Sequence, residues 1–137
     1  MQKNTGFKRV YKAAIYSWQG FRQAFQYEAA FRQEVFLALI LIPVTFFLPV
    51  TAIERVLMIM VVALVLIAEL LNSAVEAVVD RIGDEYHELA GRAKDMGSAA
   101  VFVALVLVPL VWELFFGLGD CGVFNRPSPV YTASMTV

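Results

Sequence analysis

Two acids and an amide interrupt the most apolar part of this 137-residue chain, at Glu69, Asn72 and Glu76. Spacings of three and four residues place these side chains on one face of a helix, and Asp80 continues that face one turn further. An ionisable group at bilayer depth costs about 2.5 to 3.5 kcal/mol on insertion scales, so the stripe requires a partner such as a metal ion, a polar substrate or water. The pattern therefore indicates an active site carried by membrane helices.

The composition is typical of an integral membrane protein. Hydrophobic residues make up 60% of the chain and charged residues only 17%. Because each membrane-spanning helix needs about 20 apolar residues, the chain has room for three or four helices and no separate soluble domain. The single cysteine, Cys121, excludes an intramolecular disulfide and a Cys-based zinc site, and His87 is the only histidine. Any bound metal should therefore prefer oxygen ligands, which favours magnesium or calcium.

We expect an all-α fold with an amphipathic surface helix and three membrane-spanning helices. Residues 1–28 repeat apolar side chains at three- and four-residue intervals, with basic residues on the opposite face and Thr5 as the expected cap. Pro43 should kink the first span and Pro49 should help to end it. The expected elements after the surface helix are spans at 29–50, 56–79 and 96–116, a charged cytoplasmic loop at 80–95 and a flexible tail at 117–137.

Lysine and arginine are distributed unevenly between the two sides of the membrane. They number six in residues 1–34 and three in residues 80–95, but only one each in the short turn and in the tail. By the positive-inside rule, the amino terminus and the charged loop lie in the cytoplasm and the tail lies outside. The surface helix, the end of the second span and the charged loop then meet on the cytoplasmic side, where we expect the site.

The residues alone leave other interpretations open. Asn72 and Ser73 could serve only as interhelical hydrogen-bonding contacts. A small oligomeric ion channel could place Glu69 and Glu76 around a pore, although a channel does not need charged residues converging from the cytoplasmic side. The chain contains no G-x-x-x-x-G-K-[ST] motif, so nucleotide binding, if present, does not use a P-loop.

Three runs of the sequence resemble the prokaryotic membrane diacylglycerol kinase family: Glu28–Glu34, Glu69–Gly83 and Glu85–Ala100. The similarity extends from Thr5 to Phe116, and only the tail and the prolines of the first span depart from the pattern. It implies a homotrimer in the bacterial inner membrane, with one surface helix and three spans per chain, active sites shared between neighbouring chains, and a periplasmic carboxyl terminus.

The same resemblance implies a reaction. The γ-phosphoryl group of MgATP would be transferred to the primary hydroxyl of diacylglycerol, which gives phosphatidic acid and serves phospholipid recycling. Undecaprenol kinase, a relative with the same chemistry and a polyprenol acceptor, stays open as an alternative.

The resemblance also implies roles for individual residues. Glu69 resembles the general base for the lipid hydroxyl, Asn72 helps to position the reacting groups, and Glu28 and Glu76 resemble carboxylates that bind magnesium and its ATP. The other expected ATP contacts are Arg9, Tyr16, Asp80, Glu85, His87, Lys94 and Asp95. The lipid-binding cleft is expected to include Glu69 together with Ala14, Trp18, Arg22, Ala30, Arg32, Gln33, Glu34, Arg55, Ser98 and Trp112.

Overall fold

The structure is a computed structural model that describes residues 5–117, and every regular element in this range is helical. The helices are α1 at Phe7–Tyr27, α2 at Ala29–Thr45, α3 at Ala52–Ile82 and α4 at Glu88–Trp112, which continues into a short π-helix, η1, at Glu113–Gly117. The predicted all-α architecture is confirmed. Apart from Gly117, the predicted tail lies outside the described residues.

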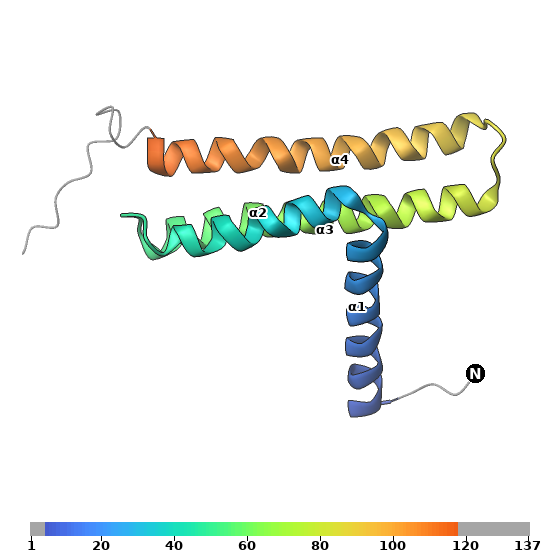
Figure 1. The fold of residues 1–137 in the computed structure, drawn as a ribbon, viewed down its shortest axis with the longest axis horizontal. Coiled ribbons are helices and arrows are strands. Elements are labelled where there is room, and N and C mark those ends of the chain that lie inside the picture. The colour runs from blue at the N-terminus through green and yellow to red at the C-terminus, as the bar shows by residue number, and fades with distance from the viewer. Residues whose placement is uncertain (1–4, 118–137) are drawn as a thin grey trace, which may run out of the picture.

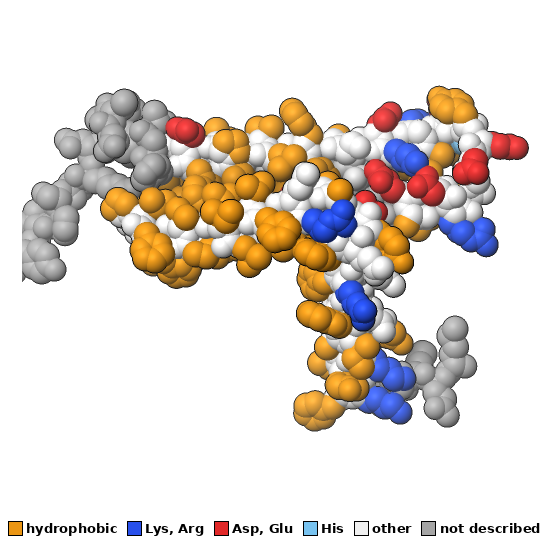
Figure 2. Space-filling model, viewed as in Figure 1, with side chains coloured by type: hydrophobic (Ala, Val, Ile, Leu, Met, Phe, Trp, Pro, Cys, Tyr) orange, Lys and Arg blue, Asp and Glu red, His pale blue; other side chains and the backbone are white. Residues whose placement is uncertain are grey.

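The long helices α2, α3 and α4 run side by side, whereas α1 leaves the bundle at a steep angle (Figure 1). Apolar side chains of α1 are strongly exposed, including Phe7 at 94% and Trp18 at 70%, and Ala24 is its only buried residue. Figure 2 shows the basic side chains gathered along the other side of this helix. The predicted Thr5 cap is wrong, because α1 begins after Gly6, which has a positive φ of 71° and provides no side-chain hydrogen bond. The amphipathic pattern alone defines the helix.

A single residue, Glu28, separates α1 from α2 and lies in extended conformation. Arg32 fixes this corner, because its Nη1 donates hydrogen bonds to the carbonyl oxygens of Phe25 at 2.8 Å and Gln26 at 3.0 Å. These carbonyls belong to the last turn of α1, which has no intrahelical donors for them. Arg32, expected in the lipid-binding cleft, therefore holds α1 at its angle to the bundle.

The helix α2 is shorter than the span predicted at 29–50. It contains 17 residues and ends at Thr45, which gives a length of about 25 Å against a hydrocarbon core of about 30 Å. Pro43 lies in its last turn, where it has no N–H to donate to the carbonyl oxygen of Leu39 and its ring crowds that carbonyl. Among the described residues, two helices are long and apolar enough to cross a membrane, Ala52–Ile82 and Glu88–Phe115. The first predicted span is not among them.

The turn from α2 to α3 is held by side chains from α3. The Nε of Arg55 donates to the carbonyl oxygen of Thr45 at 2.9 Å, and its guanidinium lies 5.4 Å from the centre of the Phe46 ring. Thr51 and Glu54 form a capping box, in which each side chain accepts a hydrogen bond from the other residue's backbone N–H. This cap lets α3 begin at Ala52, earlier than the predicted residue 56.

We expect Arg55→Met to destabilise the protein without changing its use of lipid. Methionine keeps the aliphatic bulk but removes the donors at the α2 carboxyl end, a loss of about 1.5 to 3 kcal/mol for a charged hydrogen bond. Thermal unfolding in detergent micelles should occur at a lower temperature, with an unchanged KM for the lipid substrate that the resemblance implies. A raised lipid KM with unchanged unfolding would instead support the role expected for Arg55 in the lipid-binding cleft.

The connection from α3 to α4 is much shorter than the charged loop predicted at 80–95. The helix α3 continues to Ile82, Gly83 follows it, and His87 caps α4 by accepting a hydrogen bond at Nδ1 from the Leu89 N–H, 3.1 Å away. Between α3 and α4, only residues 83–87 are non-helical. The charged residues on either side of this loop are therefore held on helices rather than on a flexible segment.

The helices α3 and α4 form an antiparallel hairpin along most of their length (Figure 1). Val65, Ala68 and Ala104 form its buried core. Near the end opposite the loop, the indole Nε1 of Trp112 donates to the carbonyl oxygen of Met58 at 3.3 Å. Packing of small side chains in the middle and this bond near the end fix the register of the two helices.

Candidate active site

The carboxylate of Glu69, in the middle of α3, lies within electrostatic range of three others, which come from the α1–α2 corner, α2 and α3 itself. Glu69 is only 5% exposed, and the charges of Glu28 and Glu76 both act on it. Glu34, on α2, lies near enough to feel the charge of Glu69 in turn. Because α3 is continuous from Ala52 to Ile82, the expected stripe lies on one helical face. Acids that repel one another at this depth require a cation or a proton to be stable together.

Asn72 lies between Glu69 and Glu76 on the same stripe. Its Nδ2 donates to Oε1 of Glu76 over 3.4 Å. Its Oδ1 and the hydroxyl oxygen of Ser73 are buried and have no hydrogen-bond partner among the described residues. Leaving such a group unsatisfied costs about 1 to 3 kcal/mol, so both atoms are candidate contacts for a group from outside the chain.

An ion pair joins the two helices beyond this stripe. The Nζ of Lys94 on α4 lies 2.6 Å from Oδ1 of Asp80 on α3. The side chains are 43% and 65% exposed, respectively, and solvent-exposed pairs contribute only about 0 to 1 kcal/mol. Lys94 can therefore exchange its carboxylate for a phosphate oxygen at little cost.

Expected ATP contacts also gather at the loop between α3 and α4. A cavity of about 720 Å³ lies there, and its lining includes Glu85, His87 and Asp84. Figure 2 shows acidic and basic side chains clustered at this end of the bundle, whereas the remainder of the bundle is mainly hydrophobic. This end has the polarity that a water-soluble substrate needs.

Two further cavities each include one of these acids in their lining. One of about 400 Å³ lies between the end of α1 and α3, where Tyr27 and Glu28 face Ser73. The other, of about 130 Å³, lies among α2, α3 and α4; Glu34 is its only charged residue and aliphatic side chains such as Leu37 form the rest. The Oε2 atom of Glu34 is buried without a hydrogen-bond partner in the described part of the chain. An acid at the edge of an apolar cavity suits a ligand with a polar end and a hydrocarbon end.

Several expected site residues are not brought to this cluster. Arg9 precedes Glu28 by 19 residues, which places it about 28 Å away along α1. Four other expected site residues are also exposed on this helix: Ala14, Tyr16, Trp18 and Arg22. Arg55 precedes Glu69 by 14 residues, or about 21 Å along α3, and Trp112 contacts the same end of the bundle. Ala30, Gln33, Asp95 and Ser98 are exposed on α2 and α4. Within one chain, the acids therefore lie together, but the expected site residues on α1 do not reach them.

The residues present fit a metal that arrives with a nucleotide better than a resident one. Within residues 5–117, no group of three or more His, Cys, Asp or Glu side chains is arranged to hold a metal ion. Magnesium is commonly bound by only one or two carboxylates together with substrate phosphates. Glu28 and Glu76, with their oxygen donors, meet that requirement.

The sequence analysis did not single out Gly97. In the structure, a Cβ atom built at Gly97 would collide with the Asn72 amide. The available signal was a row of small residues at Ala93, Gly97, Ala100 and Ala104, the spacing by which membrane helices approach closely. Such a row identifies a packing face but not the side chain that occupies it.

Comparisons with known proteins agree with the resemblance in the sequence. A family model described as prokaryotic diacylglycerol kinase matches residues 15–116. Among curated relatives named diacylglycerol kinase, one from Haemophilus influenzae is 60% identical over 118 residues, which cover 85% of this chain and all of that protein. Relatives from Escherichia coli K12 and Pseudomonas aeruginosa are 59% and 57% identical over 108 residues, which cover 79% of this chain and 88% of each relative.

Proposed function

The chain belongs to the prokaryotic diacylglycerol kinase family, and we propose that it transfers the γ-phosphoryl group of MgATP to the primary hydroxyl of diacylglycerol. The product is phosphatidic acid, which returns to phospholipid synthesis. The observation that carries this proposal is the buried Glu69, which lies within electrostatic range of Glu28, Glu34 and Glu76. Phosphoryl transfer needs positioned charge rather than extensive covalent chemistry, so a cluster of this size suffices.

In the proposed mechanism, Glu69 is the general base. One carboxylate oxygen of Glu69 accepts the proton of the diacylglycerol hydroxyl while the hydroxyl oxygen forms a bond to the γ-phosphorus. The bond between the γ-phosphorus and the oxygen that bridges it to the β-phosphate breaks, and ADP leaves with the bridging oxygen. The burial of Glu69 at 5% exposure supports this role, because a base shielded from water takes its proton from the bound substrate rather than from solvent.

Glu28 and Glu76 are proposed to hold magnesium, and Asn72 to orient Glu76 through the bond from its Nδ2. Magnesium, when bound with ATP, neutralises phosphate charge. Lys94 leaves Asp80 for the phosphates, while Glu85, His87 and Asp95 contact the nucleotide near the loop cavity. The exposed ion pair and the polar cavity support this assignment.

The lipid is proposed to reach Glu69 from the apolar side. The cavity beside Glu34 is lined by aliphatic side chains of α2, α3 and α4, which suits the glycerol end of a lipid whose chains remain in the bilayer. Undecaprenol presents the same hydroxyl chemistry, but the family match and the curated relatives favour diacylglycerol.

The proposed membrane arrangement has three spans, α2, α3 and α4, in a bacterial inner membrane. With α1 lying in the cytoplasmic headgroup plane, its exposed aromatic face contacts lipid and its basic residues contact phosphates. The steep angle between α1 and the bundle supports this geometry (Figure 1). The amino terminus and the site are then cytoplasmic, and the carboxyl terminus is periplasmic.

A homotrimer would complete the site. Arg9, Tyr16 and Trp18 are exposed on α1, which leaves the bundle of its own chain at a steep angle (Figure 1). In a trimer, the α1 helix of one chain can lie beside the acids of another. Exposed apolar side chains along α3 and α4, such as Leu71 at 64% and Phe102 at 67%, provide surface for both lipid and neighbouring chains.

The proposed function is tested by product formation in detergent micelles. We expect the wild-type protein to convert diacylglycerol and MgATP labelled at the γ-phosphate into labelled phosphatidic acid, with much slower labelling of undecaprenol. Labelling of undecaprenol alone would make the protein a polyprenol kinase. Absence of any labelled lipid, together with ion flux through liposomes, would replace the kinase by the channel alternative.

A further inference from the structure

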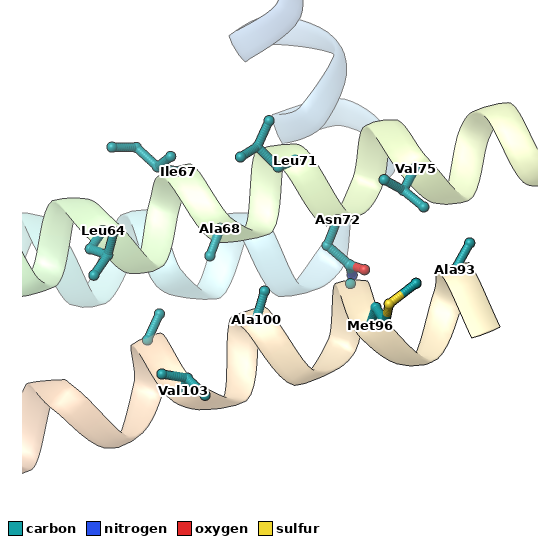
Figure 3. Close-up of a pocket in the computed structure, with 12 residues that line it drawn as sticks. Leu64, Ile67, Ala68, Leu71, Asn72, Val75, Ala93, Met96, Ala100 and Val103 are labelled. Atoms are coloured by element: carbon teal, nitrogen blue, oxygen red, sulfur yellow. The ribbon is translucent and has the colours of Figure 1, made fainter. Parts of the chain in front are cut away.

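The helices α3 and α4 lie close together where Asn72 faces Gly97. In Figure 3 the Asn72 amide points toward α4, between Ala93 and Ala100, within the groove that separates the two helices. The groove has a volume of about 510 Å³, and Asn72 is its only polar side chain. The amide therefore needs a specific space at this point of the helix pair.

That space exists because residue 97 has no side chain. A Cβ atom at Gly97 would overlap Oδ1 of Asn72 and lie 3.3 Å from its Cγ. By contrast, a Cβ atom at Gly91, on the same helix, would have only one neighbour, Cε2 of Tyr86 at the ordinary contact distance of 3.9 Å. Of these two glycines of α4, only Gly97 leaves space that a neighbouring side chain occupies.

Displacement of the Asn72 amide would affect Glu76 directly. The bond from Nδ2 of Asn72 to Oε1 of Glu76 is already long at 3.4 Å, so a small rotation away from α4 removes it. The other end of the amide, Oδ1, is buried without a partner among the described residues. An amide in this state is positioned by the shape of its surroundings, and Gly97 provides that shape.

We propose that Gly97 is a positioning residue for phosphoryl transfer: by leaving room for the Asn72 amide, it holds the Glu76 carboxylate in place. Gly97 contacts no substrate and acts through Asn72 alone. The inference rests on the proposed function, in which Glu76 binds magnesium. It adds a residue of α4 to a site whose acids come from α3 and the α1–α2 corner.

The first experiment compares Gly97→Ala with Gly91→Ala in detergent micelles. Gly97→Ala should lower kcat about tenfold, because the displaced Asn72 amide no longer holds the Glu76 carboxylate in place, and should raise the magnesium concentration for half-maximal rate. Gly91→Ala should change neither quantity by more than about twofold, since its Cβ atom has an ordinary neighbour. A shift in magnesium dependence is the readout that a purely structural defect would not produce. Equal effects of the two substitutions, or an unchanged magnesium dependence in Gly97→Ala, would overturn the proposal.

A double-mutant cycle with Asn72→Ala tests whether Gly97 acts through Asn72, even where Gly97→Ala folds poorly. Asn72→Ala removes Cγ and Oδ1, the atoms that a Cβ atom at residue 97 would meet most closely. Adding Gly97→Ala to Asn72→Ala should therefore change the residual rate, the magnesium dependence and the unfolding temperature little. A further loss equal to that of Gly97→Ala alone would show that residue 97 acts independently of Asn72 and would overturn the proposal.

Failure of this inference is distinct from failure of the proposed function. If the wild-type protein forms no phosphatidic acid, the kinase assignment fails before any variant is compared. If it does form product and the cycle is additive, the kinase stands and Gly97 is only a packing residue.

Discussion

Glu69→Gln is expected to abolish phosphatidic acid formation while ATP binding is retained. Glutamine has the shape of glutamate but cannot accept the proton of the lipid hydroxyl. Loss of a general base lowers kcat by about 10²- to 10⁴-fold. The nucleotide contacts expected at Lys94 and at the loop between α3 and α4 lie outside the substitution. Rates of labelled product formation and equilibrium binding of ATP in the same micelles test the two halves of the prediction.

Stability provides a second readout for the same variant. Glu69 is 5% exposed and close to Glu28 and Glu76, so removing one acid from the cluster relieves repulsion and desolvation. Glu69→Gln should thus unfold at a temperature at least as high as the wild type. Glu113→Gln, an exposed acid in η1 at the other end of the bundle, is the matched control and should retain full activity. Wild-type product formation by Glu69→Gln would exclude Glu69 as the base.

Regular periodicity made much of the fold predictable from sequence. The amphipathic repeat of α1 and the long apolar runs of α3 and α4 depend on local spacing, and all three helices occur where that spacing predicts them. The predicted ends were less accurate, because they depend on caps. Thr51, Glu54 and His87 place helix starts by hydrogen bonds that a hydropathy pattern does not contain.

The end of α2 shows a different limit of prediction from sequence. Hydrophobicity alone extends it to residue 50, but Pro43 and the contacts of Arg55 with Thr45 and Phe46 form a turn inside that apolar run. Apolar residues after Thr45 therefore belong to a connection rather than to a helix. A long-range contact from α3 decides the end of α2, and no local rule predicts such a contact.

At the site, too, local spacing predicts some features, whereas others depend on contacts between helices. Helical spacing alone placed Glu69, Asn72 and Glu76 together, because i, i+3 and i+7 positions share one face. The approach of Glu28 and Glu34 requires the α1–α2 corner, which Arg32 holds by bonding to carbonyl oxygens of α1. Arg32 and Arg55 were expected to bind lipid, and the structure gives each a capping contact that sequence reasoning did not anticipate.

Glu76→Gln is expected to lower activity through loss of charge rather than of position. The amide keeps an Oε1 atom that can accept the hydrogen bond from Nδ2 of Asn72, so the local geometry is preserved. One anionic ligand for magnesium is lost, and removal of a preorganised electrostatic contact typically lowers kcat about 10²- to 10³-fold. Product formation measured across magnesium concentrations should show a higher half-maximal concentration as well as a lower maximum.

Comparison with Gly97→Ala separates the contribution of the Glu76 charge from the contribution of its position. Both variants should weaken the response to magnesium, but only Glu76→Gln removes charge, so only its defect should persist when Asn72 is also replaced by alanine. Glu88→Gln, in the exposed first turn of α4, controls for loss of an acid at the loop end of the bundle and should behave like the wild type. An unchanged magnesium dependence in Glu76→Gln would mean that the metal is held by other oxygens. The stripe on α3 would then serve proton transfer alone, with Glu76 acting as a neighbour that tunes the charge of Glu69.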